Sequence, residues 1–498
     1  MSASYNDHVH RRDDELKPPE VIRAEHIASQ EPSMDQKDVS RLLLKMDLFL
    51  MPTVALLYLF CFIDRANIGN ARLAGFEKDL GLRGYDYNTV LSVFYISYII
   101  FEIPSNIVCK LLGPGWFIPA ISLGFGLCSI GTAFVNNRAQ VCAVRFLLGV
   151  FEAGVLPGIA YYLSRFYSRA ELGFRLGLYI VMAPLAGAFG GLLASAILTL
   201  DNFGSLTAWR MIFAIEGIIT IILSLLAFLT MTDRPQTARW LTDREKAYTE
   251  HKLRAERVGS SAVLDKMDKK KLFRGVSNPV TLGTAVIFMF DSVTVQGLGF
   301  FTPTIIRTIY PGRTIIQQQL LTVPPYIVGS FFVIVVTLLS WKLDRRLVLI
   351  ILSTPLVIVG YIIFLSSYVP RIRYAAAFLV ASTVFGIGPL CTAQASANVV
   401  SDTSRNSAIA TAIMFSNMGG LVSTWSYLPH DAPHFRIGMG LNLATAAGML
   451  VLGVVLLLWM RRDNRSREKC NSEEELAGVP EDQIQDMDWK HPDFRWHP

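Results

Sequence analysis

Four charged residues stand within or beside apolar stretches of this sequence, where ionised side chains are costly to bury and usually line a cavity or an ion path. Asp64 and Arg65 directly follow the uncharged run 48–63. Arg145 and Glu152 lie seven positions apart, which places them on one helix face about 10 Å apart along the axis. The two arginines could bind an anion, and carboxylates held away from water could take up and release a proton. The same charges could instead form a static ion-pair network that locks helices together.

Further polar side chains lie in the same apolar stretches. Asn67 adds an amide close to the first pair, and we expect it to take part in binding. For Glu102 a gate ion pair or a helix-end contact is more plausible than substrate binding. Asp291 and Gln296 could face a cavity and tune specificity. Glu216 can be assigned only as a buried partner of some other group.

The composition indicates a protein that crosses a membrane many times. Of 498 residues, 52% are hydrophobic and 17% are charged, against about 25% charged residues in soluble proteins. A spanning helix needs about 20 mostly apolar residues. We therefore predict an all-α integral membrane fold with twelve transmembrane helices. They are expected at 46–66, 89–111, 116–136, 139–162, 174–198, 209–231, 280–303, 317–341, 347–367, 374–398, 406–428 and 438–460.

A charged stretch divides these helices into two sets of six, and the division gives the expected domain organisation. Six-helix halves at 45–231 and 279–461 are joined by a linker at 232–278, with tails at 1–44 and 462–498. Two halves of this kind place a substrate at their interface, near the bilayer midplane. The C-terminal tail is polar, and we expect it to be disordered.

Basic residues set the predicted orientation, because loops on the cytoplasmic side are enriched in lysine and arginine. Arg165 and Arg175 fall on the same side as the linker, Lys342, Arg461 and Arg462. Both tails and the linker are therefore expected in the cytoplasm.

Motifs for other kinds of chemistry are absent from the sequence. It contains no GxxxxGK[ST], HExxH or GxSxG pattern, and its six cysteines have no CxxC spacing, which fits small packing residues. We expect no catalytic residue, no metal and no cofactor. The basic residues collect between apolar spans, which indicates membrane topology and not binding of nucleic acid.

Several short motifs together resemble one family. They are FIDRANIGNARL (62–73), FEIPSN (101–106), RFLLGVFEAGVLPG (145–158), WRMIFAIEG (209–217), LTVPPYIVG (321–329) and NMGG (417–420). These motifs resemble the anion:cation symporter family of the major facilitator superfamily, and within it the fungal allantoate and nicotinate permease branch. The resemblance covers about residues 40–498.

The resemblance implies roles for the residues that match the family's motifs. It implies proton coupling for Asp64 and Glu152 and substrate binding for four residues: Arg65, Arg145, Tyr98 and Asn417. The loop SWKLDRR (340–346) is similar to the superfamily's gate signature, so Asp344 and Arg345 are expected to act in gating.

The function implied by the resemblance is proton-coupled uptake of a small organic anion across the plasma membrane by alternating access. Nicotinate, allantoate or a related carboxylate would be the substrate, and the protein would act as a monomer in the lipid bilayer. Two alternatives remain open. MAPLAGAFGG (182–191) is loosely similar to an antiporter motif and would suit an exporter of an acidic metabolite. A nutrient sensor that binds without transport would call for longer tails.

Overall fold

Helices are the regular elements throughout the part of the chain that the computed structural model describes, which is residues 34–200, 208–259, 269–400, 402–469 and 487–498. Parts of all five predicted segments lie outside it. These are 1–33 of the N-terminal tail, 201–207 of the first half, 260–268 of the linker, 401 of the second half and 470–486 of the C-terminal tail.

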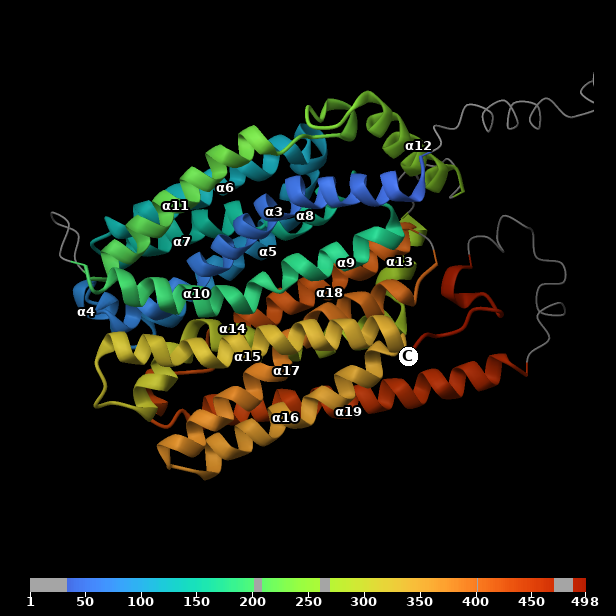
Figure 1. Ribbon diagram of the computed structural model, residues 1–498. Coiled ribbons are helices and arrows are strands. Elements are labelled where there is room, and N and C mark those ends of the chain that lie inside the picture. Colours follow the sequence, from blue (N-terminus) through green and yellow to red (C-terminus); the bar gives the residue numbers. More distant parts are fainter. Residues whose placement is uncertain (1–33, 201–207, 260–268, 401, 470–486) are drawn as a thin grey trace, which may run out of the picture.

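The long helices run side by side in one elongated bundle (Figure 1). We call the end with α12 and α13 the linker end and the opposite end, with α4 and η2, the far end. The first set of helices is α3 (Gln36–Leu73), α4 (Phe76–Asp79), α5 (Asp86–Leu112), α6 (Pro114–Ala133), α7 (Arg138–Glu152), α8 (Val155–Ser164), α9 (Arg169–Ile180), α10 (Met182–Ile197) and α11 (Trp209–Thr230).

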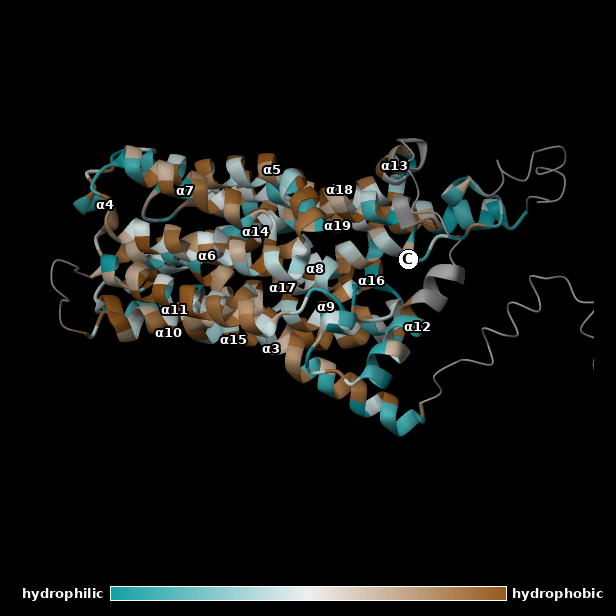
Figure 2. Ribbon diagram, turned by 90° about the horizontal axis from the view of Figure 1, so that it is seen from above, coloured by the Kyte–Doolittle hydropathy of each residue, from teal (hydrophilic) through white to brown (hydrophobic). Residues whose placement is uncertain are grey.

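Three short helices connect this first half to the second: η1 (Pro235–Thr237), α12 (Asp243–Gly259) and α13 (Lys269–Val276). The second half contains α14 (Pro279–Ile309), α15 (Ile315–Leu343), α16 (Arg346–Ser366), α17 (Pro370–Ala397), α18 (Asp402–Ser423), η2 (Pro429–Asp431), α19 (Arg436–Arg467) and η3 (Asp488–Lys490). The two halves meet where α3 packs on α14, α5 on α18 and α10 on α15. Figure 2 shows apolar residues along the bundle and polar residues gathered at its ends, around α4 and α12.

Eleven stretches of the described residues are long and apolar enough to cross a membrane. Each of the pairs α7–α8 and α9–α10 forms one of them. The helix α18, expected as a further span at 406–428, packs against α14, α17 and α5 but is too polar over its described residues to be counted. The all-helical membrane fold is thus confirmed, and eleven of the twelve expected spans meet this measure.

Two of the predicted spans are interrupted near their middle, each four residues before a proline. Proline has no N–H to donate to the carbonyl one turn earlier. Pro157 accordingly leaves the carbonyl of Ala153 without its helical partner, and α7 ends at Glu152. Pro184 does the same at Ile180, the last residue of α9. The first break places Glu152 at a helix end inside the bundle.

The linker helix α12 is fastened to the first half by ion pairs. Lys45 Nζ lies 2.8 Å from Glu245 Oε2, and Lys252 Nζ donates to Glu171 Oε1. Partial burial disfavours the charged Glu171 carboxylate, but hydrogen bonds from Lys252 and Ser168 outweigh it and hold the pKa of Glu171 below its ordinary value. The contact is therefore built on a carboxylate that stays ionised at neutral pH.

The expectation that the C-terminal tail is disordered is wrong for residues 487–498. The Trp496 side chain is 2% exposed, and its Nε1 donates to Asp463 Oδ2 at 2.6 Å. The backbone N–H of Trp496 also donates to Asn464 Oδ1 at 2.9 Å. Polar composition suggested disorder, but buried aromatic rings supply the apolar surface that docks this segment on the end of α19.

Candidate functional site

The centre of the first half is an ion pair between α3 and α7. Arg65 Nε donates to Glu152 Oε2, and the two side chains are 8% and 0% exposed. The guanidinium carbon of Arg65 also lies 4.9 Å from the ring centres of Phe62 and Tyr98 and 5.4 Å from that of Phe94. Aromatic faces attract a cation, so these rings hold Arg65 in place without neutralising its charge.

A cysteine completes the surroundings of this pair. Cys61 Sγ donates to Glu152 Oε2 at 3.5 Å, and Arg65 Nη2 lies 3.9 Å from the same sulfur. Glu152 Oε1 is buried and has no hydrogen-bond partner among the described residues. One carboxylate oxygen is thus held by Arg65 while the other is left available.

Asp64 and Arg145 lie beside this pair, and only some of their polar atoms have hydrogen-bond partners among the described residues. Ser129 Oγ donates to Asp64 Oδ1 at 2.8 Å. Arg145 is 2% exposed and interacts electrostatically with Asp64 and Glu152. Within the described chain, Asp64 Oδ2 and two nitrogens of Arg145, Nε and Nη2, find no hydrogen-bond partner. Buried polar groups in folded proteins are almost always hydrogen-bonded, so these atoms could take up a proton on Asp64 or a ligand oxygen on Arg145.

A cavity of about 30 Å³ lies between the halves and reaches Arg65. It has room for a few water molecules at most, so a carboxylate substrate requires the halves to move apart. From the first half it is lined by Phe62, Arg65, Ala66, Ala183 and Gly187, and from the second by Val295, Gln296, Gly299, Phe300, Tyr326 and Phe385.

The remaining predicted binding residues lie outside this immediate cluster, except Tyr98, which contacts Arg65. Asn67 is fully buried, accepts a hydrogen bond from Asn70 at 3.3 Å and is absent from the cavity lining. Asn417 Nδ2 on α18 donates to Glu102 Oε2 on α5 at 2.9 Å. The structure therefore joins Glu102 and Asn417 in one contact between the halves.

The predicted gate residues lie at the linker end. Asp344 ends α15 in a left-handed conformation (φ 49°). Its Oδ1 accepts from Arg346 Nη2 at 2.8 Å, so the ion pair involves the second arginine of the loop. Arg345 is exposed at the start of α16.

The two polar residues expected on α14 have different positions. Gln296 lines the cavity, as proposed. Asp291 is fully buried within the second half, where it interacts with Cys391, and it does not line the cavity. Neither of its oxygens has a hydrogen-bond partner in the described part of the chain.

The far end of the interface is closed by direct contacts between the halves. Asn88 Nδ2 donates to the Thr424 carbonyl at 2.6 Å, and Ser92 Oγ lies 2.9 Å from Thr424 Oγ1. A Cβ atom placed on Gly69 would lie 2.5 Å from the Phe300 carbonyl oxygen, so only glycine allows α3 and α14 to approach this closely.

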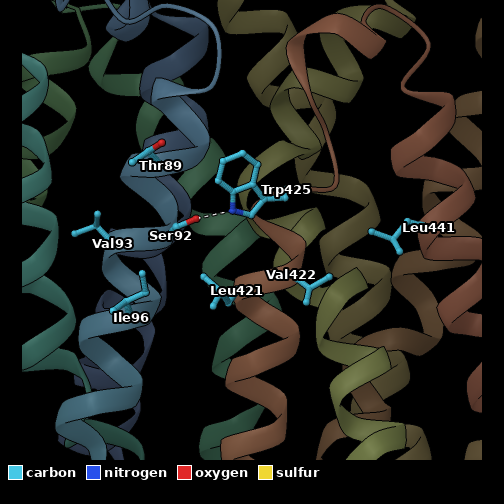
Figure 3. A pocket seen from close by; sticks show the side chains of 8 residues that line it. All are labelled: Thr89, Ser92, Val93, Ile96, Leu421, Val422, Trp425 and Leu441. Atoms are coloured by element: carbon cyan, nitrogen blue, oxygen red, sulfur yellow. Dashed lines mark hydrogen bonds between the residues drawn. The ribbon is translucent and has the colours of Figure 1, made fainter.

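A second, larger hollow of about 650 Å³ lies beside these contacts, between α5, α18 and α19 (Figure 3). Its lining is mostly apolar and includes the half-exposed Ile96, Val422 and Trp425. Trp425 Nε1 donates to Ser92 Oγ at 2.9 Å. No charged side chain lines it, so it offers nothing to neutralise an anion.

The sequence analysis did not identify Cys61 or Ser129 as members of the site. Cys61 could have been found, because it precedes Arg65 by four residues and so lies on the same face of the helix. Ser129 could not, because nothing in its own span indicates which side faces Asp64.

Comparison with known proteins agrees with this architecture. An uncharacterised transporter of Schizosaccharomyces pombe is 30% identical over 491 residues, which cover 97% of this chain and 95% of the relative. A fungal MFS transporter named prlL is 34% identical over 423 residues, 81% of this chain and 84% of the relative. A high-affinity nicotinic acid transporter of Saccharomyces cerevisiae is 29% identical over 472 residues, 93% of this chain and 86% of the relative.

Solved structures share the fold at low identity. A bacterial homologue of the human lysosomal transporter Spinster matches with a TM-score of 0.64 and 15% identity over 82% of this chain and 95% of its own. A D-xylose–proton symporter matches with a TM-score of 0.60 and 14% identity, over 81% of this chain and 97% of its own. Residues 54–424 match the profile of the Major Facilitator Superfamily. The chain is therefore a membrane transporter, not an enzyme, and it belongs to the Major Facilitator Superfamily.

Proposed function

We propose that this transporter takes up a small organic anion together with protons. The observation that carries the proposal is Arg145, a buried guanidinium with two nitrogens that no described residue binds. Because an unsatisfied buried cation is costly, the site favours a ligand that brings negative charge. A relative named as a nicotinic acid transporter makes nicotinate, or a related carboxylate such as allantoate, a reasonable substrate class.

The ion pair between Arg65 and Glu152 links anion binding to protonation. While Glu152 is ionised it occupies Arg65, and a substrate carboxylate would have to compete with it. A proton on Glu152 removes this competition at Arg65, and a proton on Asp64 weakens its hold on Arg145, so that the two arginines become available for the anion. With both charges neutralised, the halves can close over the site, and loss of the proton on the other side would release the anion.

The proposed orientation assigns the two ends of the bundle to the two sides of the membrane. We place the linker end and both termini in the cytoplasm of a plasma-membrane protein that works as a monomer, because basic residues gather on that side. The far end would then face outside. Asn417 and Glu102 would act at the interface, and Asp344 and Arg345 in the inner gate.

Uptake in a yeast that lacks its own permeases tests this proposal. Labelled nicotinate and allantoate would be supplied at pH 5 and pH 7, with and without a protonophore. We expect accumulation to be higher at pH 5 and to collapse with the protonophore. Equal uptake at both pH values, unaffected by the protonophore, would exclude proton coupling. Faster loss of preloaded anion than in control cells would favour the exporter suggested by residues 182–191.

The variant Glu152→Gln separates coupling from binding. The amide keeps the shape of the protonated acid but carries no exchangeable charge, so we expect nicotinate to bind and exchange without accumulating against a gradient. Asp243→Asn, at an exposed position of α12, is the matched control and should accumulate normally. Normal accumulation by Glu152→Gln would remove the glutamate from the coupling mechanism.

A further inference from the structure

We infer that Glu216 on α11 is a proton-binding site of the transport cycle, which exchanges its proton with Asp64. The inference rests on the proposed proton coupling and extends it to a residue that the mechanism above does not use. Glu216 belongs to the motif WRMIFAIEG and lies in the first half, away from the cavity lining.

Glu216 is a buried carboxyl without a counterion. Its side chain is 0% exposed, and within the described residues neither of its oxygens has a hydrogen-bond partner. The titratable group with which it interacts is Asp64, another carboxyl. Because an ionised carboxylate in such surroundings is strongly disfavoured, the group is stable there when it carries a proton.

Ser129 on α6 lies between Asp64 and the backbone of α11. Its hydroxyl lies 2.8 Å from Asp64 Oδ1 and 3.3 Å from the Phe213 carbonyl oxygen, three residues before Glu216. This contact places Asp64 on α3 beside the turn of α11 that leads to Glu216, and the two carboxyls interact electrostatically.

The charges of the central cluster balance only when one proton is present. Three buried carboxyls, Asp64, Glu152 and Glu216, face two buried guanidiniums, Arg65 and Arg145, whereas the buried Arg175 is paired with Asp47 outside the cluster. Full ionisation leaves one net negative charge, and one proton makes the cluster neutral. Glu152 is paired with Arg65, and Asp64 interacts with Arg145. Glu216 interacts with no arginine among the described residues, so the one proton that makes the cluster neutral resides on Glu216.

An arriving anion changes this balance through Asp64. The titratable and charged groups that interact with Asp64 come from its own helix and from α6, α7 and α11, and they are Cys61, Cys128, Arg145, Glu152 and Glu216. When the anion takes over Arg145, Asp64 loses its partner and becomes the next group to accept a proton. The anion adds one negative charge, so a second proton has to enter for the cluster to stay neutral. Glu216 passes its own proton to Asp64 and takes up the entering proton in its place, so it relays the coupled proton and is not left ionised.

Infrared spectroscopy of the purified transporter in liposomes tests the resident proton without any substrate. A protonated carboxyl gives a carbonyl stretch that an ionised one lacks. At pH 7 we expect Glu216→Gln to lose one such band, and ¹³C-labelled glutamate to shift the same band in the unmutated protein. The labelling needs no mutation, so it stands even if the variant folds poorly. Asp291→Asn is the matched control, because its lost band should be insensitive to the glutamate label.

The role in the cycle is tested by measuring how fast protons enter with nicotinate. We expect Glu216→Gln to bind nicotinate and to keep the same number of protons per molecule, because its empty cluster is neutral without a proton, but to take up both at least about tenfold more slowly. An unchanged carbonyl region in Glu216→Gln would overturn the resident proton. A lost band with an unchanged rate of proton entry would overturn its use in transport. If the unmutated protein does not move nicotinate, the proposed function fails for this substrate, whereas the substrate-free spectra still decide on Glu216.

Discussion

The two halves of the transporter differ in how their buried charged side chains are arranged. The first half encloses a cluster of five buried acidic and basic side chains around Arg65 and Glu152. Among the described residues of the second half, one carboxyl, Asp291, is fully buried and interacts with Cys391, and one arginine, Arg373, is buried near the start of α17 with two nitrogens that lack a hydrogen-bond partner. Because the first half brings buried acids and arginines together in one cluster, we expect it to neutralise the charges of the substrate and the proton.

The lining of the cavity shows the complementary pattern. The second half supplies more of it, with the amide of Gln296 and the rings of Phe300, Tyr326 and Phe385, but no charge. Amides and rings discriminate between ligands by shape and hydrogen bonding. We therefore expect the first half to decide whether an anion is moved and the second half to decide which one.

The largest effect should follow from removing the positive charge of Arg145 in the first half. Arg145→Gln leaves buried carboxylates without their partner, a change that costs about 3–5 kcal/mol, and it also removes the anion's ligand. We expect kcat/KM for nicotinate uptake at pH 5 to fall by at least about a hundredfold. Arg313→Gln, at an exposed site of the far end, is the control. Uptake above a tenth of normal by Arg145→Gln would contradict the proposed anion site.

A smaller, qualitatively different effect is expected in the second half. Gln296→Leu removes one hydrogen-bonding group from the cavity, worth about 1–3 kcal/mol, so relative KM values for nicotinate and allantoate should change by about tenfold. Competition assays measure the ratio. Protonophore sensitivity should be retained, and its loss would show that coupling is shared by both halves.

The contact that closes the far end can be weakened by a substitution that changes neither the buried charged residues nor the residues that line the cavity. Gly69→Ala puts a methyl group against the Phe300 carbonyl, and such overpacking costs about 1–3 kcal/mol. Spin labels at Arg83→Cys and Arg313→Cys, with Cys142 and Cys470 replaced by serine, would report the distance between the halves. We expect a longer distance population in the Gly69→Ala variant, and an unchanged distribution would mean that this contact does not hold the gate.

The smallest effect concerns the linker, outside both halves. The pKa of Glu171 is lowered in the folded protein, so its contribution to docking of α12 is complete above the unfolded value of about 4.3 and is lost as pH falls through the folded pKa. Hydrogen exchange of residues 243–259 should thus show equal protection between pH 8 and pH 5 and weaker protection below about pH 4. Glu171→Gln should make this step smaller without abolishing it, because the Lys45–Glu245 pair also holds α12 and, despite partial burial, its hydrogen bond keeps the pKa of Glu245 below its ordinary value. A step near pH 6 would point to another group.

The sequence was sufficient to predict which residues share one face of a single helix. A rise of 1.5 Å and 100° per residue is enough to put Arg145 and Glu152 on one face, and both are buried together as expected. Contacts between helices depend on how the helices pack, and the helical period of a sequence does not specify that packing. The approach of Glu216 to Asp64 through Ser129 is one example, and the position of Asp291 away from the cavity is another. The docked C-terminal segment was missed because its few aromatic residues were outweighed by polar neighbours.

The close approach of Gly69 to Phe300 also determines how far different parts of α3 move when the two halves tilt relative to each other. Arg65 lies four residues from this contact, about 6 Å along the axis, whereas the start of α3 at Gln36 lies about 50 Å away. If the halves tilt about this point by about 10°, Arg65 shifts by about 1 Å while the distant end of the helix sweeps about 9 Å. The same tilt therefore moves the linker end of α3 several times farther than it moves Arg65, so the passage at that end can open widely while Arg65 stays close to its partners.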